Sequence, residues 1–513
     1  MITGRTIGRN GRLGNQLFQV AFLLAQSKRH GVKIGWHNWQ YAKYFKGDFK
    51  PSIIPIARTE HELAFHYTPE HYDALDWGND IDFHGYFQSY KYWQGCEDEI
   101  RASFEFVQPV TERVRAMNAA ILEKPTIAIH LRRGDYAGNP EYANLSANYY
   151  LSALEKHFPD WRQQNLVVFS DDVNYAKLHF GCFDNAHFPN GSEIDDLCLM
   201  TLCSSLIIAN SSFSWWGAYL SGSKKVVRPE RHFEGKLAGH DISDLYPSEW
   251  IKHDAERLDL RDTTFLIPVS LDHPDRLANL ELILQTLICQ FDTNFIVCEQ
   301  GGEHFKSVGQ FCEYLRIDSA TFHRTRMLNI MAEMANTPYV VNYDADVLLS
   351  PSQILESVAR LRNGADVVYP YAGRFVRLPR NVWYRRLMHS LDIGETAGHN
   401  FAVLRRGDTD SKGGCVFFNR ESFFAGGGEN ENFVSFGHED EERFYRFAKL
   451  GYDVQRVNGN IYHMEHYCGV NSSTKNPAYV NNVKEWERVK KMDAEQLRAY
   501  IASFAIPEKC LSL

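Results

Sequence analysis

Residues 126–136 read TIAIHLRRGDY, an apolar run of strand length that leads directly into two arginines, a glycine and an aspartate. Stretches of helical length separate this run from similar ones at residues 166–170, 206–209, 265–268, 294–298 and 339–342. Strands that alternate with helices are typical of α/β proteins built on parallel sheets. Ligands of such sheets bind at the carboxyl ends of the strands. We therefore expect the chemistry of this protein in the residues that follow its apolar runs.

Length and composition restrict the class of protein. The chain has 513 residues, which at roughly 150 residues per domain predicts about three globular units. Hydrophobic residues make up 44% and charged residues 23% of the chain, and these values exclude a disordered, collagenous or coiled-coil protein. The formal net charge of -9 gives no sign of a nucleic-acid partner. Any bound phosphate must therefore be held by local groups.

The short apolar stretch near the start and the spacing of the cysteines predict a cytoplasmic protein. The longest apolar stretch near the start, residues 20–25, is too short for a secretory signal or a membrane span. The ten cysteines show no CxxC pair and no zinc-type spacing, so neither a disulfide framework nor a structural zinc site is expected. We expect a cytoplasmic protein without a membrane span, at most peripheral to a membrane.

Two features suggest domain boundaries. A charged segment at residues 250–262 precedes a fresh strand, and Glu123-Lys-Pro125 precedes another. The predicted divisions are residues 1–255, with subdomains of about 1–120 and 121–255, then residues 262–485, and finally residues 486–513 as a C-terminal helix and tail.

Two segments of the first domain place ligand-binding groups beside a helix or a strand. The turn Gly11-Arg-Leu-Gly-Asn15 leads into a helix whose free N–H groups suit an anionic or polyhydroxyl ligand. A turn that only packs the helix is the alternative. The strand ending at His130 leads into Arg132-Arg133, and an arginine fork can hold a diphosphate without a metal. A surface ion pair with Asp135 is the alternative there.

Two further apolar runs of this domain end in hydroxyl and carboxylate side chains. Phe169-Ser-Asp-Asp172 follows one run, and Asn210-Ser-Ser-Phe-Ser-Trp-Trp-Gly217 follows the other. The serines can hydrogen-bond phosphate or sugar at the entry to the next helix. Asn210 also begins an Asn-Ser-Ser sequon, and a glycan there would obstruct the site, which again favours the cytoplasm over a secretory lumen.

The second domain gathers carboxylates and histidines in three segments, which contain Asp344 and Asp346, Glu439 and Asp440, and His463 and His466. Together they supply ligands for a hard cation and a general base. Taken separately, a DxD is a common acidic turn, and the second acidic pair can be charges that favour a helix N-terminus. The histidines can likewise be structural.

The motifs of the first half, in this order, resemble those of the α-1,2-fucosyltransferases over about residues 5–255. The resemblance implies a GT-B-like pair of Rossmann-type domains. It also implies an inverting, metal-independent transfer of fucose from GDP-fucose to a terminal galactose, with no cofactor.

The same resemblance assigns roles to individual residues. Arg132 or Arg133 would hold the β-phosphate, and Asn15 would approach the fucose. Arg132 and His130 are the expected catalytic residues, while the general base stays open between His130 and Asp135. The residues expected to line the donor site are His130, Ser211, Ser212 and Phe213.

The second half resembles the β-1,4-galactosyltransferases and related hexosyltransferases of the GT-A fold over about residues 264–468. Segments 322–329, 344–346, 413–414 and 437–440 carry the resemblance. The family pattern usually has tryptophan where this chain has Phe436 and glycine where it has His438, and this leaves donor and linkage less defined than the fold.

This second resemblance implies a Mn²⁺ (or Mg²⁺) site and a general base. Asp346, with Asp344 nearby, and His466 or His463 would bind the metal. Arg324 and Asn329 would contact the donor. Asp440 would deprotonate the acceptor hydroxyl while Glu439 orients the sugar.

The two resemblances together predict a bifunctional inverting glycosyltransferase. The C-terminal domain would transfer galactose from UDP-galactose to a glycan acceptor, and the N-terminal domain would add α-1,2-linked fucose to that galactose. The acceptor can be a polysaccharide, a lipid-linked glycan or a protein-linked glycan. One alternative makes the second domain an N-acetylhexosaminyl- or glucosyltransferase. Another makes one half an inactive glycan-binding module.

Overall fold

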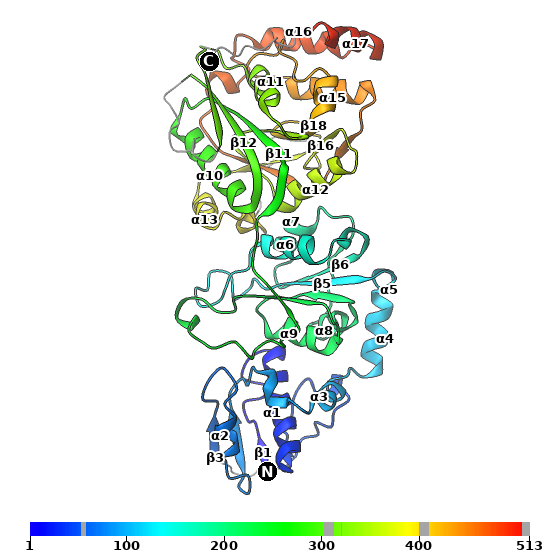
Figure 1. Ribbon diagram of the computed structural model, residues 1–513, viewed down its shortest axis with the longest axis vertical. Coiled ribbons are helices and arrows are strands. Elements are labelled where there is room, and N and C mark those ends of the chain that lie inside the picture. Colours follow the sequence, from blue (N-terminus) through cyan, green and yellow to red (C-terminus); the bar gives the residue numbers. More distant parts are fainter. Residues whose placement is uncertain (53–57, 302–311, 320, 400–409, 505–513) are drawn as a thin grey trace. The chain divides into compact units, whose positions relative to one another are not determined.

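The computed structural model describes residues 1–52, 58–301, 312–319, 321–399 and 410–504. It divides into two compact units (Figure 1). The first unit comprises Met1–Ala176 and Asn185–Ala255, and the second comprises Lys177–Asp184 and Glu256–Leu513. Both units are mixed α/β structures that contain parallel strands, which confirms the expected α/β class. Every helix among the described residues is too short or too polar to cross a membrane.

The first unit contains two parallel sheets. One has the strand order β2-β1-β4-β3 and consists of β1 (Ile2–Thr3), β2 (Ile34–Gly35), β3 (Arg58–His61) and β4 (Ile81–His84). The other has the order β10-β9-β8-β5-β6-β7 and consists of β5 (Thr126–Leu131), β6 (Asn165–Ser170), β7 (Ala186–His187), β8 (Ser205–Ile207), β9 (Val226–Pro229) and β10 (Ile251–His253).

The α-helices of residues 1–255 are α1 (Leu13–His30), α2 (Pro69–Asp73), α3 (Glu97–Ser103), α4 (Gln108–Met117), α5 (Ala119–Leu122), α6 (Ala147–His157), α7 (Val173–Phe180), α8 (Glu193–Leu202) and α9 (Ser212–Ser221). An aromatic core joins α1 to α9, because Phe18 packs against both Trp215 and Trp216 at centroid distances of 4.6 and 5.1 Å. Both tryptophans are fully buried, so they stabilise the fold and do not form a sugar platform.

The second unit is built on a seven-stranded mixed sheet. Its order is β13-β12-β11-β14-β18-β16-β19, formed by β11 (Leu258–Val269), β12 (Phe291–Gln300), β13 (Glu313–Ile317), β14 (Tyr339–Tyr343), β16 (Val367–Tyr369), β18 (Cys415–Asn419) and β19 (Val454–Arg456). The first four strands in that order are parallel, and β18 runs antiparallel to β14. A three-stranded sheet adds β15 (Val347–Leu348), β20 (Asn460–Met464) and β17 (Arg374–Leu378).

The α-helices that follow residue 255 are α10 (Pro274–Gln290), α11 (Arg324–Met334), α12 (Pro351–Arg362), α13 (Val382–Ser390), α14 (Arg420–Ala425), α15 (Glu439–Leu450), α16 (Tyr479–Val489) and α17 (Ala494–Ala502). The boundary expected between residues 485 and 486 falls inside α16. Leu497 and Tyr500 form a small core with Val489, against which Tyr445 of α15 packs. The described part of the expected C-terminal tail therefore consists of the end of α16 and of α17, and its apolar side chains pack on the second unit.

Candidate active sites

Arg132 and His130 lie where β5 ends, as the sequence predicts. Arg132 Nη1 pairs with Asp171 Oδ2 at 2.6 Å, and the other end of the guanidinium pairs with Asp135. Its side chain is 13% exposed. The alternative interpretation, an Arg–Asp pair, is thus present, but it holds the guanidinium at the strand end, where parallel sheets bind ligands.

Arg133 lies in a different environment from its neighbour. Its guanidinium stacks over the Tyr175 ring at 4.2 Å, and its Nη1 donates to Asn144 Oδ1 at 2.9 Å. The residue is 5% exposed. Of the two arginines, Arg132 is therefore better placed to meet a ligand, while Arg133 packs inside the unit.

His130 is buried beside the start of α9. Its ring lies 5.7 Å from that of Phe213, and its Nδ1 has no hydrogen-bond partner among the described residues. Burial lowers the pKa of His130 to about 4, so the ring is neutral at physiological pH. A neutral imidazole can accept or donate one hydrogen bond to a ligand, but burial makes it a weak proton acceptor.

Asn15 and Ser212 meet where the N-termini of α1 and α9 approach each other. Ser212 Oγ donates to Asn15 Oδ1 at 2.6 Å, and Gln88 Nε2 donates to the same oxygen at 2.8 Å. Ser211 is the N-cap residue of α9. Two helix N-termini that come together present N–H groups suited to an anionic ligand. Gln88 belongs to this cluster and was missed from the sequence, because it lies in a loop far from every quoted motif.

Gly14→Ala should separate these two helix ends. A Cβ on Gly14 would lie 2.5 Å from Phe213 N and 2.6 Å from Ser212 C, both of which are backbone atoms. We expect a loss of about 1–3 kcal/mol in the unfolding free energy and a raised KM for the nucleotide donor of the first unit. Thermal unfolding and donor titration measure these effects. Gly239→Ala is the matched control, because its Cβ would meet nothing within 4 Å; equal effects in both variants would contradict this reasoning.

In the second unit, Asp346, His463 and His466 form a cluster suited to a metal ion. Their ligand atoms all lie within 4.8 Å of one another. Asp346 Oδ2 is 2.9 Å from His466 Nε2 and 3.5 Å from His463 Nε2. The cluster forms because β15 pairs antiparallel with β20, which puts His463 opposite Val347, the residue after Asp346. Met464 N also donates to the Asp346 carbonyl oxygen at 2.7 Å.

The histidines determine the charge of this cluster. Burial alone would raise the pKa of Asp346, but the charges and hydrogen bonds of His463 and His466 hold it well below its usual range. For His466, burial lowers the pKa and the contact with Asp346 outweighs it, so that the net shift is upward. His466 Nδ1 contacts the Tyr467 carbonyl oxygen at 2.7 Å, which directs Nε2 toward the carboxylate.

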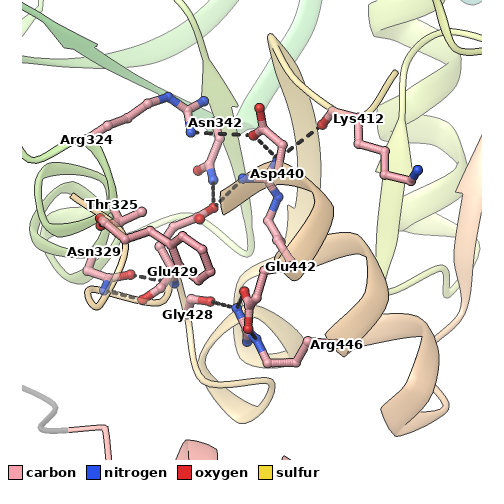
Figure 2. Close-up of polar contacts among 12 residues, drawn as sticks. Arg324, Thr325, Asn329, Asn342, Lys412, Gly428, Glu429, Asp440, Glu442 and Arg446 are labelled. Atoms are coloured by element: carbon pink, nitrogen blue, oxygen red, sulfur yellow. Dashed lines mark hydrogen bonds and ion pairs between the residues drawn. The ribbon is translucent and has the colours of Figure 1, made fainter. Parts of the chain in front are cut away.

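Asp344 lies outside this cluster in the structure, and its expected role as a metal ligand stays a prediction. Arg324 donates to Asp344 Oδ1 through Nε at 3.0 Å and through Nη2 at 2.7 Å. Its Nη1 lies 3.7 Å from Asp440 Oδ1. The two aspartates of the DxD turn thus have different partners: Asp346 faces the histidines, and Asp344 faces an arginine at the start of α11 (Figure 2 shows Arg324 and Asp440).

Glu439 and Asp440 begin α15. Asp440 Oδ1 accepts from Arg443 Nη2 at 2.7 Å, and Glu439 Oε2 accepts from Gly437 N at 3.0 Å. A Cβ on Gly413 would lie 2.5 Å from Asp440 Oδ2, so the absence of a side chain at Gly413 leaves room for this carboxylate. His438 precedes the pair with φ +65°, a region that favours glycine.

Glu439 should make the unfolding free energy depend on pH. Burial, followed by the charge of Asp440, raises its pKa to about 8 from 4.5. The folded state therefore binds the proton more tightly than the unfolded state does. We expect this contribution to be complete below about pH 4.5 and to be lost as the pH rises through about 8. Urea unfolding of the wild type and of Glu439→Gln at several pH values tests this: the variant should lack this downward slope, and an identical slope would contradict it.

A buried network supports the acidic pair, and the sequence did not reveal it (Figure 2). Glu429 Oε1 accepts from Arg443 Nη1 at 2.9 Å and from Asn342 Nδ2 at 2.5 Å. Arg443 is 0% and Glu429 is 2% exposed. Arg443 also donates to Asp440. One set of polar contacts therefore joins β14, α15 and the glycine-rich loop, which we define as residues 426–432. The repeated charges of α15 gave no signal for burial, because helices with such charges are usually solvated.

Asn329 holds the same glycine-rich loop in place. Its Nδ2 donates to the Glu429 carbonyl oxygen at 3.0 Å and to Glu431 Oε1 at 3.0 Å, while its Oδ1 accepts from Glu429 N at 2.8 Å. All three hydrogen bonds join the Asn329 amide to residues of the loop, so the amide positions the loop in this structure. The expected contact between Asn329 and a donor stays a prediction.

Glu429→Gln should destabilise the second unit. The substitution leaves the Arg443 guanidinium buried without its carboxylate on that side, and breaking such a pair costs about 3–5 kcal/mol. Chemical unfolding measures the change, and activity should fall with it because Arg443 also holds Asp440. Glu441→Gln in α15 is the control, because this carboxylate is partly exposed and lies 3.9 Å from His438. A loss below 1 kcal/mol for Glu429→Gln would show that the pair is not structural.

Both halves of the chain match known families. Residues 2–253 match the family model described as glycosyl transferase family 11. Residues 404–467 match the one described as the N-terminal domain of galactosyltransferase. The two resemblances predicted from the motifs are thereby confirmed: the chain carries a fucosyltransferase-family domain followed by a galactosyltransferase-like domain.

Curated relatives cover the first half. The O-antigen biosynthesis glycosyltransferase WbnK of Escherichia coli is 38% identical over 136 residues, which are 25% of this chain and 44% of that protein. An alpha-1,2-colitosyltransferase of Escherichia coli is 29% identical over 185 residues, 34% of this chain and 62% of that protein. Galactoside alpha-(1,2)-fucosyltransferase 1 of Aotus azarae is 26% identical, covering 43% of this chain and 66% of that protein. The chain thus spans about half the length of the two bacterial relatives.

Solved structures resemble the chain only distantly. The catalytic domain of Drosophila beta1,4-galactosyltransferase 7, in complex with xylobiose, is 17% identical and covers 38% of this chain and 64% of that one, with a TM-score of 0.26. GalNAc-T7 with UDP, GalNAc and Mn²⁺ is 12% identical and covers 51% and 53%, with a TM-score of 0.33.

Proposed function

We propose that the chain is a bifunctional inverting glycosyltransferase with one active site in each unit. The second unit transfers galactose from UDP-galactose to a glycan, and the first adds α-1,2-linked fucose from GDP-fucose to that galactose. The observation that carries the proposal is that two different glycosyltransferase family models match the chain, one over residues 2–253 and the other over residues 404–467. Each half also brings its charged motif residues together, around Arg132 in one and around Asp346 in the other.

For the first unit, two parallel sheets support a GT-B-like pair of Rossmann-type domains. Arg132 is oriented by Asp135 and Asp171, and its guanidinium is the group we assign to the β-phosphate. It stabilises the charge that develops as the sugar leaves the diphosphate. The N-termini of α1 and α9, with Asn15 and Ser212, supply hydrogen bonds to the same donor. Colitose in place of fucose is the second candidate, because an α-1,2-colitosyltransferase is among the relatives.

For the second unit, we propose a GT-A-like domain that binds Mn²⁺ or Mg²⁺. A carboxylate oxygen and two imidazole nitrogens, all within 4.8 Å of one another, can hold a divalent transition ion, and this mixed set favours Mn²⁺ over Mg²⁺. Asp346, His463 and His466 would hold it. A bound cation neutralises charge on the departing nucleotide diphosphate.

The remaining residues of this site act on the two sugars. Arg324 contributes a fixed positive charge beside Asp344 and Asp440 and is assigned to the donor. Asp440 is assigned to the acceptor hydroxyl as proton acceptor, and Glu439 is assigned to the sugar as orienting group. Asp440 carries an ion pair with Arg443, whereas Glu439, with its pKa raised to about 8, is largely protonated at neutral pH and can donate a hydrogen bond to a sugar oxygen. pH–rate profiles of Asp440→Asn and Glu439→Gln, measured side by side, show which residue is the proton acceptor and which is the orienting group.

The two activities form a sequence. An α-1,2-fucosyltransferase needs a terminal galactoside, which the other unit produces on the same chain, so tethering raises its effective concentration. The hypothesis fails if the first unit accepts only glycans that the second unit cannot make.

Donor consumption by the purified chain tests the whole proposal. GDP-fucose, UDP-galactose, UDP-GalNAc, UDP-GlcNAc and UDP-glucose are each supplied with Mn²⁺ or with EDTA. We expect GDP-fucose turnover to survive EDTA and UDP-galactose turnover to require Mn²⁺. Use of another UDP-sugar would make the second unit an N-acetylhexosaminyl- or glucosyltransferase. If only one nucleotide class is consumed with every acceptor tested, the silent half is a glycan-binding module.

A further inference from the structure

A polar hollow lies at the carboxyl edge of the four-stranded sheet, directly before the Gly11–Asn15 turn in the chain. Its volume is about 500 Å³, and its lining residues are Thr6, Arg9, Asn10, His61, His84 and Gly85. The first three follow β1, and the others end or follow β3 and β4. His61 and His84 are register partners on neighbouring parallel strands, with ring centroids 5.3 Å apart. The parallel register therefore assembles the hollow at the edge where such sheets bind ligands.

A buried carboxylate fixes one wall of this hollow. Asp82 is 2% exposed, and its Oδ2 lies 2.8 Å from His84 Nε2. Asp82 Oδ1 also accepts from Arg5 N at 2.9 Å. Because a carboxylate accepts hydrogen bonds, Nε2 of His84 carries a proton, and in the neutral ring Nδ1 is the accepting nitrogen. Because Asp82 contacts Nε2 of His84, the nitrogen that is left to contact a ligand is Nδ1.

The loops that form the hollow also reach the proposed donor site of the same unit. The loop after β1 continues from Asn10 to Arg12, whose Nη2 lies 3.9 Å from Asp135 Oδ2, and Asp135 pairs with Arg132. The loop after β4 continues from Gly85 to Gln88, which donates to Asn15. A molecule bound in the hollow would thus contact two loops that, a few residues further on, contact Asp135, the partner of Arg132, and Asn15.

We propose that this hollow binds the acceptor saccharide of the first unit, an inference that rests on the proposed function of that unit. Its lining alternates donors and acceptors: a guanidinium, an amide, a hydroxyl and two imidazoles, with no large apolar side chain. This composition suits a neutral, hydroxyl-rich sugar, because a guanidinium can bridge two adjacent hydroxyls while His84 Nδ1 accepts from a third. His84 and Arg9 are the binding residues, and Asp82 positions His84.

Two variants and a control test the assignment. Arg9→Ala and His84→Ala should each raise the acceptor KM about tenfold, as expected for one lost hydrogen bond to a charged or oriented group, with less than a twofold change in the KM for GDP-fucose. Arg9 is exposed, so its variant retains the fold even if that of His84 does not. Arg58→Ala, at the opposite end of β3, should change neither constant. Unchanged acceptor KM values in both variants would overturn the proposal.

Direct binding separates this inference from the proposed function. Saturation-transfer NMR with methyl β-galactoside should show contact with the wild-type chain and its loss in Arg9→Ala, whether or not GDP-fucose is the donor. If the wild type binds the galactoside but does not consume GDP-fucose, the donor assignment fails and the hollow stands. If Arg9→Ala and His84→Ala both bind the galactoside as the wild type does, the hollow is not the acceptor site.

Discussion

Asp346→Asn should abolish UDP-sugar turnover by the second unit and leave GDP-fucose turnover unchanged. The carboxylate is the member of the cluster that both histidines contact, so its replacement removes an anionic ligand and the partner that orients the rings. A metal ion contributes several kcal/mol of charge stabilisation, and each 1.4 kcal/mol is tenfold in rate. We therefore expect a loss of at least about a thousandfold, together with loss of Mn²⁺ binding by calorimetry.

The control for this variant is Asp292→Asn. Asp292 is the second residue of strand β12, and its ion pairs with Arg257 and Arg261 are long, at 3.8 and 3.9 Å. It should retain both activities and Mn²⁺ binding. If Asp346→Asn also retains them, the cluster is a structural His–Asp arrangement and the metal assignment is wrong.

Arg132→Ala should produce the reverse pattern, with loss of GDP-fucose turnover and normal UDP-sugar turnover. Its guanidinium is the one at the strand end that is both oriented by two carboxylates and partly exposed. Removing one such preorganised donor from a developing charge costs about 10²–10³ in kcat. Arg132→Lys keeps the charge without the planar fork and should recover only part of the loss. Single-turnover assays with GDP-fucose, in the presence of EDTA, measure the effect.

Two further variants show whether Arg132 or Arg133 contacts the phosphate. Arg115→Ala, an exposed position on α4, should behave as the wild type. Arg133→Ala should lower the unfolding free energy, because its guanidinium stacks on Tyr175 and binds Asn144. If Arg133→Ala loses turnover without loss of stability while Arg132→Ala is active, the phosphate contact belongs to Arg133.

Much of each candidate site could be predicted because its residues lie within a few positions of an apolar run. Arg132 follows β5 and Asp346 follows β14, and the carboxyl ends of parallel strands are where such sheets bind ligands. The sequence could not predict Glu429 and Arg443 as buried partners, because one lies in a glycine-rich loop and the other in a highly charged helix segment. The local sequence pattern predicted that both side chains are exposed to solvent, whereas packing against β14 buries them.

The sequence by itself determined the two-part organisation, the alternation of strands and helices, and the family of each half, since these depend on local periodicity and on short ordered motifs. Only the tertiary structure decided which partner each of two neighbouring residues contacts. Asp346 meets the histidines because β15 pairs with β20, while Asp344 meets Arg324. Arg132 stays at the strand end, while Arg133 packs on Tyr175. The physical reason is that strand pairing and core packing join residues distant in the chain, and neighbours in sequence can point into different surroundings.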